Sequence, residues 1–190
     1  MVFFPVFAFS QKPDEGKETF DVFIPSKTGP TIIPGSEPLP RSFRKLELGM
    51  TLDELKFELA GDGLFEFRGD RDVSFLPAKE ENLVETTGLS FIRRAFFQLR
   101  KGKVFIMAFN LDTRLLDHYS VYTSLVKKYG EPTSINPQEA VWESEDTRLT
   151  IERPLTLKYL DKEVFDDLVK ESRTRESLEL FLREEFLRDL

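Results

Sequence analysis

Apolar positions between residues 50 and 61 recur at the spacing of an amphipathic helix. The residues on the apolar side are Leu52, Leu55 and Leu59. Thr51 stands at the N-cap with Glu54 three residues later, which is the pattern of a capping box, and Met50 with Leu55 forms the matching hydrophobic staple. Gly61 is suited to end the helix. This stretch therefore predicts one helix that packs its leucines against a core.

Two longer apolar runs predict a β-hairpin further along the chain. Residues 91–99, FIRRAFFQL, and residues 104–111, VFIMAFNL, flank a turn at Lys101 and Gly102. The second run is apolar at nearly every position from residue 104 to 109. Such continuity favours an interior strand that is covered on both faces, or nearly so.

A two-residue turn at Lys101 and Gly102 would fix the register of this hairpin. The side chains expected on the core face are Leu99 opposite Val104, Phe97 opposite Ile106, and Ala95 opposite Ala108. The opposite face of the hairpin carries aromatic residues, methionine and arginine around a few polar groups. Protein interfaces are enriched in these residue types. We therefore predict a partner-binding face, unless the C-terminal helices cover it. Its residues are Arg94 with Phe109, Phe96 with Met107, and Gln98 with Phe105.

A second amphipathic helix is predicted between residues 115 and 129. Its apolar positions are Leu115, Tyr119, Val121, Tyr122, Leu125, Val126 and Tyr129. Gly130 fits the left-handed position that follows a helix, and Pro132 prevents the helix from continuing. A polar loop then leads to Trp142, the only tryptophan in the chain. We expect its ring to pack under the helix.

The order of helices and strands indicates the fold class. Residues 141–151, VWESEDTRLTI, read as two strands joined by a charged turn, and residues 155–159 continue the sheet. Residues 65–76, FEFRGDRDVSFL, have the same pattern around Gly69, so we expect a hairpin there. The two similar segments suggest two helix-plus-hairpin units. We predict an α+β domain over residues 43–160, with an antiparallel sheet and helices packed on one face.

The N-terminal segments differ from this domain. Residues 1–10, MVFFPVFAFS, are predominantly apolar, and Ala8 and Ser10 have the small side chains required before a signal-peptidase cleavage at Gln11. We predict a signal-peptide remnant and export to the periplasm or beyond. A buried first strand is the alternative, and it would place the protein in the cytoplasm. Residues 11–42 contain repeated prolines and are predicted to be a tether.

Residues 161–190 are predicted to form a helical tail, with a short helix after Asp161 and a longer one after about Thr174. One face of the longer helix is apolar and the other is densely charged. The apolar residues are Leu178, Phe181, Leu182 and Phe186. Either this helix packs on its own domain or it binds a partner.

Composition narrows the possible functions. The 190 residues are 40% apolar and 32% charged, which is typical of a globular domain. Nineteen phenylalanines indicate a core of rings that need no hydrogen-bond partner. A net charge of −7 without a long basic run argues against nucleic acid as a partner. No run reaches the roughly 18 apolar residues of a membrane span, and no cysteine is present to form a disulfide or carry a lipid.

Candidate catalytic residues are few. The single histidine, His118, follows Asp117 at the expected helix start, but no G-x-S-x-G nucleophile elbow accompanies the pair. Three aspartates lie within residues 61–72, at a spacing that does not match a calcium-binding loop. The Arg-Gly-Asp tripeptide in the same segment is explained by a turn between strands. We predict no catalytic residue, no metal site and no cofactor.

Two motifs resemble exported bacterial domains. The stretch LELGMTLDELKFEL is similar to the opening of the SmpA/OmlA (BamE-like) family and of related proteins with the β-lactamase-inhibitor-protein fold. The segments LVKKYGEP and VWESEDTRLTI resemble a later element of such domains. The resemblance implies a periplasmic domain whose sheet binds a protein partner, and it transfers no catalytic residue. This chain differs in lacking the lipid-bearing cysteine and in adding a helical tail.

These observations favour a non-catalytic protein-binding domain of the bacterial envelope. Membrane association would then occur only through a partner. Two alternatives remain open. One is a carrier of an apolar ligand, suggested by the phenylalanine content, and the other is a hydrolase that uses carboxylates.

Overall fold

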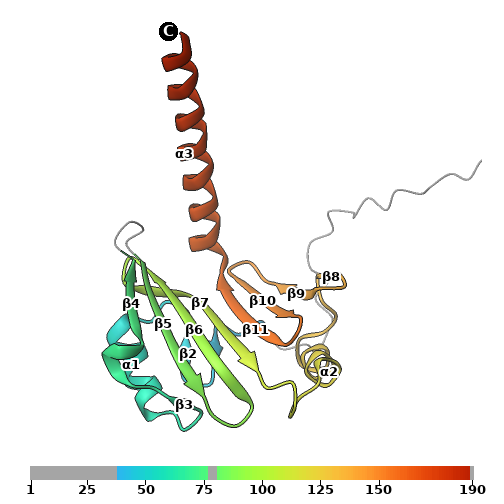
Figure 1. Cartoon of the computed structure of the whole chain (residues 1–190). Coiled ribbons are helices and arrows are strands. Elements are labelled where there is room, and N and C mark those ends of the chain that lie inside the picture. Colours follow the sequence, from blue (N-terminus) through green and yellow to red (C-terminus); the bar gives the residue numbers. More distant parts are fainter. Residues whose placement is uncertain (1–37, 77–80, 189–190) are drawn as a thin grey trace, which may run out of the picture.

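The computed structural model describes residues 38–76 and 81–188 (Figure 1). The expected signal-peptide remnant, residues 1–10, lies outside the described residues, and so do residues 11–37 of the expected tether. Within the described part, strands and two helices form one domain from which a third, long helix projects (Figure 1).

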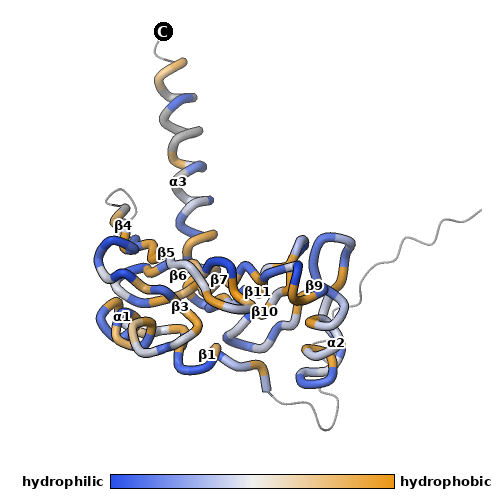
Figure 2. Tube along the Cα trace, turned by 60° about the horizontal axis from the view of Figure 1, so that its bottom comes forward, coloured by the Kyte–Doolittle hydropathy of each residue, from blue (hydrophilic) through white to orange (hydrophobic). Residues whose placement is uncertain are grey.

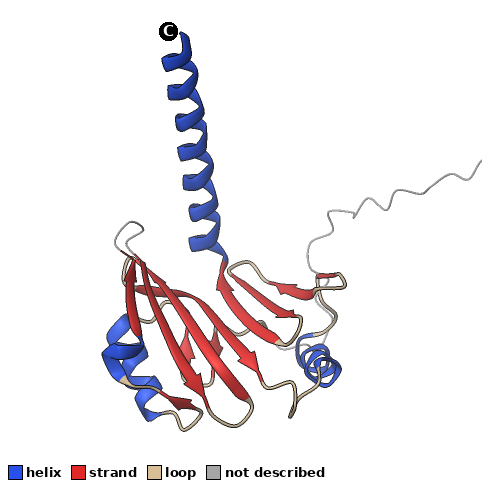
Figure 3. Cartoon of the chain, viewed as in Figure 1, coloured by secondary structure: helices blue, strands red, loops and turns tan. Residues whose placement is uncertain are grey.

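The domain is built on a nine-stranded antiparallel sheet (Figure 3). Its strand order is β3-β5-β6-β7-β11-β10-β9-β8, with β4 also paired to β5. The strands are β3 (Phe65–Glu66), β4 (Val73–Leu76), β5 (Glu81–Gly88), β6 (Ile92–Arg100), β7 (Lys103–Leu111), β8 (Ser134–Ile135), β9 (Glu139–Glu143), β10 (Thr147–Glu152) and β11 (Thr156–Asp161). A separate two-stranded ribbon consists of β1 (Ser42–Phe43) and β2 (Leu46–Glu47). The predicted α+β class is confirmed.

Helices α1 (Leu52–Gly61) and α2 (His118–Tyr129) pack against one face of the sheet, as predicted. Figure 2 shows both helices below the sheet and the third helix rising above it. Residues of both helices belong to the same hydrophobic cluster as Phe97 and Phe109, which are fully buried on the sheet. The Phe109 ring lies 5.8 Å from the Phe97 ring and 4.4 Å from the Phe43 ring. Phenylalanine rings therefore fill this core.

The local signals predicted for α1 are confirmed. Thr51 is the N-cap, and its hydroxyl accepts a hydrogen bond from the Glu54 main-chain N at 3.4 Å. The Glu54 carboxylate accepts one from the Thr51 main-chain N at 2.8 Å, which completes the capping box. Leu55 and Leu59 are fully buried. The helix packs its leucines on the core and ends at Gly61.

Helix α2 is shorter than predicted. It begins after the N-cap Asp117, because the Asp117 carboxylate accepts a hydrogen bond from the Ser120 main-chain N at 2.8 Å. Leu115 precedes the helix in a turn and is 56% exposed, and Tyr119 is 73% exposed. Their assignment to the apolar face was wrong. The other five predicted positions pack against the core as expected: Val121, Tyr122, Leu125, Val126 and Tyr129.

The hairpin predicted around Gly69 does not form. Residues Gly69–Asp72 make a short 3-10 helix, and β3 and β4 each pair with β5 rather than with each other. The cause is the burial of Asp72, whose carboxylate accepts hydrogen bonds from the main-chain N and the Nε of Arg68, at 2.9 and 2.8 Å. These bonds wind the chain into a turn. The first predicted unit therefore differs from the second, in which β9 and β10 form the expected hairpin.

The predicted register of the β6-β7 hairpin was correct only next to the turn. Leu99 pairs with Val104 as expected, but Gln98 pairs with Ile106, so Phe105 is an extra residue in a β-bulge. The bulge shifts the pairs from Gln98–Ile106 to Arg94–Asn110 by one residue, so Phe97 lies opposite Met107 instead of Ile106. A second irregularity between Ile92 and Arg94 restores the register at the Ile92–Leu111 pair. An extra residue moves the following side chains to the other face of the sheet.

The C-terminal tail is one helix rather than the predicted two. Helix α3 (Lys162–Arg188) begins directly after β11, and the Asp161 carboxylate accepts a hydrogen bond from the Val164 main-chain N at 3.1 Å. Neither glycine nor proline interrupts it, and the Thr174 hydroxyl donates to the main-chain oxygen of Lys170 within the helix. The polar stretch is therefore compatible with a continuous helix. No helix in the described residues is long and apolar enough to cross a membrane.

Candidate partner-binding groove

The sheet face opposite α1 and α2 carries a groove of about 510 Å³. Its apolar lining comes from five strands and from the first turns of α3. These residues are Leu83 (β5), Phe96 (β6), Ile106 and Ala108 (β7), Leu160 (β11), Val141 (β9) and Phe165 (α3). Helix α3 borders the groove only through Phe165 and then projects away from the sheet (Figure 1). The face is therefore largely uncovered in the described part of the chain.

The bulge at Phe105 creates the middle of this groove. It places Ile106 opposite Gln98 and Ala108 opposite Phe96, so these four side chains share one face. On the other side of β7, Ile106 pairs with Leu160 of β11. Without the extra residue, Ile106 and Ala108 would join the core, as the uninterrupted register predicts. The bulge thus extends an apolar surface across three neighbouring strands.

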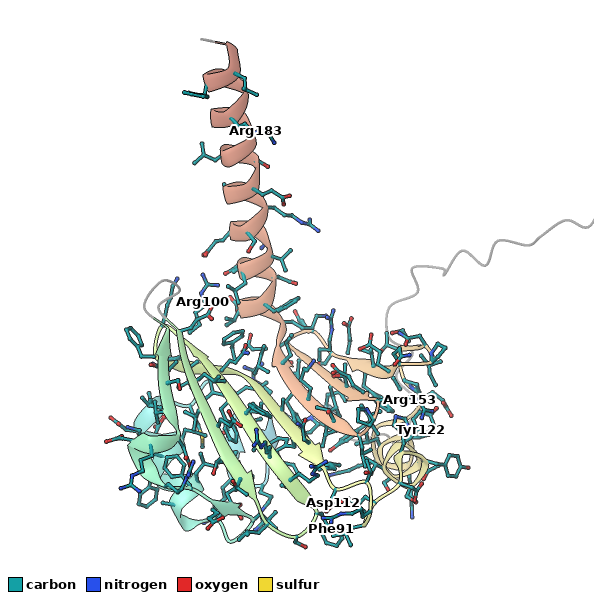
Figure 4. The ribbon with its side chains drawn as sticks, in the orientation of Figure 1. Phe91, Arg100, Asp112, Tyr122, Arg153 and Arg183 are labelled. Atoms are coloured by element: carbon teal, nitrogen blue, oxygen red, sulfur yellow. The ribbon has the colours of Figure 1, made fainter. Side chains whose placement is uncertain are left out.

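Ion pairs surround the apolar centre. Arg94 of β6 pairs with Glu85 of β5 at 2.7 Å. Further pairs join Arg148 to Glu143, Lys158 to Glu152, and Arg100 to Glu171 at the base of α3, where Figure 4 labels Arg100. All of these pairs are partly exposed, so each contributes little to folding stability. Charges of both signs around an apolar centre instead favour selective contact with another surface.

One polar group in the groove lacks a partner among the described residues. The Thr150 side chain is 4% exposed and lines the groove, and its hydroxyl oxygen is buried without a hydrogen bond. A buried hydroxyl without a partner is destabilising by about 1–3 kcal/mol. A ligand or protein partner that reaches the floor of the groove can remove this cost by bonding to Thr150.

The six predicted site residues separate into two groups. Phe96 and Gln98 line the groove, and Arg94 is exposed on the same sheet face beside Glu85. Met107 and Phe109 are fully buried in the core, because the bulge reverses their direction. Phe105 is the bulged residue, and it is 3% exposed and lies outside the core cluster. The predicted face is therefore incomplete on β7.

Sequence reasoning missed the contribution of the C-terminal strands. Val141 and Thr150 face the groove, whereas their neighbours Trp142 and Leu149 face the core. The alternation in residues 141–151 contains this information. That these strands lie beside β7 depends on the pairing of β11 with β7, which no local pattern reveals.

His118 lies in a second, smaller cleft of about 350 Å³ between the start of α2 and the loop before β9. Its Nε2 atom is buried and has no hydrogen-bond partner among the described residues. Burial, and secondly the charge of Arg153, lower the pKa of the imidazole below its usual value. Asp117 serves as the helix cap through Ser120. The lowered pKa of His118 favours the neutral imidazole, and the Asp117 carboxylate is bonded to Ser120.

Each of the three aspartates in residues 61–72 bonds to a different basic side chain. Asp62 accepts a hydrogen bond from the Arg44 Nε at 2.8 Å, and Asp70 accepts one from the Lys56 ammonium at 2.7 Å. The third, Asp72, is held by Arg68. Within residues 38–76 and 81–188, no cluster of three or more histidine or acidic side chains is arranged to hold a metal ion.

Comparison with known proteins identifies one family. The sequence model of the TP0088 domain matches residues 41–171, from the start of the β1-β2 ribbon into the first turns of α3. The match includes every strand of the groove and Phe165 at its edge. No curated protein matches the chain significantly, and no solved structure does.

Proposed function

The chain belongs to the TP0088 domain family, and we propose that it is a non-catalytic protein-binding module of the bacterial envelope. The observation that carries this proposal is the largely uncovered groove on the second sheet face. Soluble domains rarely leave a contiguous apolar surface open without a use for it. The groove is therefore where a protein partner docks.

The composition of the groove supports a protein rather than a small polar ligand. The centre contains Phe96, Ile106 and Leu160 on adjacent strands, and charged pairs surround it. An apolar core with a polar rim is the usual anatomy of a protein interface. Phe96 is half-buried in the free chain and is the largest side chain on the strands of the groove. It is the expected anchor of the interface.

Thr150 adds a specific requirement for the partner. Its unpartnered hydroxyl can accept or donate one hydrogen bond at the floor of the groove. A partner side chain of moderate length, such as serine, glutamine or glutamate, can reach this position from an apolar segment. A purely hydrocarbon ligand would leave the hydroxyl unsatisfied, so this contact favours the protein partner over the apolar-ligand carrier.

Export is a separate part of the proposal and depends on the sequence. The resemblance of residues 46–59 to BamE-like domains and the apolar residues 1–10 both support a periplasmic location. Membrane association would then occur through the bound partner. The test is the N-terminal sequence of the protein recovered from the producing bacterium, where cleavage before Gln11 is expected. A chain that keeps residues 1–10 and fractionates with the cytoplasm would contradict export.

Site-specific photo-cross-linking tests the binding function. A photoreactive amino acid replaces Gln98, which is exposed in the groove, and in a control chain replaces Phe57, which is 77% exposed on α1. We expect a discrete cross-linked polypeptide from position 98 and none from position 57. The substitution Phe96→Asp should abolish that product. Equal products from both positions, or none from position 98, would contradict the proposal.

A further inference from the structure

The chain itself contains a helix suited to the groove: we propose that α3 of a second copy of this chain docks there. Two copies would then exchange their C-terminal helices in a symmetric dimer. This inference rests on the proposed function, because it names one partner of the same groove.

The distal half of α3 exposes apolar side chains. Leu178 is 56% exposed, Phe186 is 66% exposed and Leu187 is 56% exposed. Leu178 and Phe186 belong to the apolar stripe that the sequence predicts for this helix. Beyond Glu171, which pairs with Arg100, the side chains that the structure describes make no ion pair to the sheet domain. Figure 4 shows Arg183 far out on the projecting part of the helix.

The helix cannot place this stripe in its own groove. α3 starts at the groove, where Phe165 contributes to the lining, and it continues without a break. Leu178 lies sixteen residues beyond Lys162, which corresponds to about 24 Å along the helix axis. A straight helix that leaves the groove at its first turn cannot return to it. The groove of a second copy remains accessible to the stripe.

The dimensions of the stripe and the groove agree. Leu178 and Phe186 are separated by eight residues, or about 12 Å along the axis. Strands β6, β7, β11 and β10 are successive neighbours and span about 14 Å across the sheet. One segment of two to three turns can therefore cover the groove from Phe96 to the buried Thr150.

The local charges permit this contact although each chain has a net charge of −7. Residues 172–188 contain four arginines and four glutamates, so the distal half of α3 has no net charge of these residue types. The charged residues that line the groove are also balanced, with Arg148 and Lys158 against Glu139 and Glu152. Both surfaces present charges of both signs around an apolar centre, which allows complementary pairing at the rim.

Symmetry makes the exchange reciprocal. If the helix of one copy enters the groove of the other, a two-fold axis brings the second helix to the first groove. The two contacts form together and cover both open faces. Laying an amphipathic helix in an apolar groove is a common mode of recognition between proteins. The dimer would also exclude any other protein from the groove.

Sedimentation equilibrium of the full chain and of paired variants tests the inference. We expect the wild-type chain to dimerise. The helix variant combines Leu178→Glu with Phe186→Glu and alters only exposed positions of α3. The groove variant carries Phe96→Asp. Each should weaken dimerisation by about tenfold or more. The control Phe57→Glu removes an exposed ring from α1 and should leave the dimer unchanged.

Mixing the variants distinguishes exchange from simple pairing of two α3 helices. The helix variant retains an intact groove, and the groove variant retains an intact helix. Their mixture should therefore form a heterodimer, although each variant alone dimerises only weakly. Gln98→Arg, at an exposed position in the groove, replaces Phe96→Asp if that variant fails to fold. Far-UV circular dichroism verifies folding in each case.

Two results would overturn the inference. One is a wild-type chain that stays monomeric at high concentration. The other is a groove variant that dimerises like the wild type, together with a mixture of the two variants that does not restore dimerisation of the helix variant. In that case α3 would pair with α3 and not with the groove. Cross-linking from position 98 to a different polypeptide, unchanged by the helix variant, would support the proposed function while refuting exchange. Loss of all cross-links from position 98 would refute the proposed function itself.

Discussion

The indole Nε1 of Trp142 donates a hydrogen bond to the main-chain oxygen of Gly130, at a distance of 2.8 Å. Gly130 ends α2 and Trp142 lies in β9, so this bond ties the helix terminus to the sheet. The Trp142 side chain is almost fully buried, and its ring lies 6.0 Å from that of Tyr122 on α2. The ring packs under the helix, as its position in the sequence predicts.

Two substitutions separate the packing of Trp142 from its hydrogen bond. Trp142→Ala removes a buried ring from the core and should lower the free energy of unfolding by about 3–5 kcal/mol. Trp142→Phe retains most of the apolar contact but leaves the Gly130 oxygen without its donor, and should cost about 1–3 kcal/mol. Urea unfolding followed by circular dichroism measures both values. Equal losses in the two variants would mean that the hydrogen bond contributes more than the packing.

Gly130 has a φ of +83°, a backbone conformation that other residues adopt only with strain. Gly130→Ala should therefore lower the free energy of unfolding by about 1 kcal/mol, and Gly130→Val should lower it further. Gly63 is a matched control, since it lies in a turn, its φ is not positive and an added methyl group would meet open space. Gly63→Ala should leave stability unchanged or raise it slightly. The same cost at both positions would argue against backbone strain.

Because of the bulge at Phe105, substitutions in the β6-β7 hairpin should lower the free energy of unfolding by different amounts on the two sheet faces. Met107→Ala and Phe109→Ala remove fully buried core residues and should each cost about 2–5 kcal/mol. Phe96→Ala alters a half-buried ring in the groove and should cost clearly less. Chemical denaturation of the three variants measures the order. A larger loss at Phe96 than at Met107 would favour the uninterrupted register.

Signals carried by neighbouring residues were sufficient to predict much of the fold. The capping box at Thr51 fixes the start of α1, and Gly130 with Pro132 fixes the end of α2, because each effect acts within a few residues. Turns at Lys101 and near Ser144 join strands that pair directly with each other. These elements have the predicted identity because their stabilising contacts lie close in sequence.

The errors occurred where distant contacts decide the structure. Residues 104–109 are apolar on both sides, so the sequence contains no alternation from which the bulge could be located. The predicted hairpin at Gly69 is replaced by a turn because Asp72 is buried against Arg68. Most of the groove was missed for a related reason. Its lining depends on the pairing of β11 with β7, which joins segments about fifty residues apart.

His118 should make stability depend on pH near neutrality. Burial, and secondly the charge of Arg153, lower its pKa in the folded chain below the ordinary value of 6.5, while Asp117 acts in the opposite direction. The unfolded chain then binds a proton more readily, so stability is lost as the pH falls from about 7 through the folded pKa. In His118→Gln this loss should be absent. Unfolding at a series of pH values measures the difference.

Direct titration of the His118 ring separates its protonation from that of other titratable groups. His118 is the only histidine in the chain, so its ring protons give one set of signals in a nuclear magnetic resonance spectrum. The midpoint of this titration should lie below 6.5. Arg153→Gln should move it upward, because the substitution removes a nearby positive charge. A midpoint above 6.5 in the wild-type chain would contradict the burial of this side chain.

Asp112 connects β7 to the start of α2 and should control stability in acid. Its main-chain N donates a hydrogen bond to the Phe91 oxygen at 2.8 Å, and Figure 4 shows the two residues close together. Its carboxylate accepts hydrogen bonds from the side chain and the main-chain N of Arg114, including one of 2.9 Å from Nε. The side-chain bonds from Arg114 lower the pKa of Asp112 from 3.8 to about 2.

The sign of the pH dependence follows from this shift. Well above the unfolded pKa of 3.8 the carboxylate is ionised in both the folded and the unfolded chain, and the contact with Arg114 stabilises the fold in full. As the pH falls from about 4 to 2, the unfolded chain takes up a proton before the folded chain does, so this stabilisation is lost. Arg114→Gln removes the largest cause of the shift. It should destabilise the protein at pH 6 and have little further effect at pH 2.

Carboxylate titration by nuclear magnetic resonance measures the same contact at Asp112 itself. The wild-type signal should have its midpoint near 2, and Arg114→Gln should move that midpoint toward 3.8. Arg183→Gln is the control, because Arg183 is exposed far out on α3 and does not contact Asp112. A wild-type midpoint near 3.8 would show that Arg114 does not hold the carboxylate in solution. The turn that leads into α2 would then depend on the main-chain bonds of Asp112 alone.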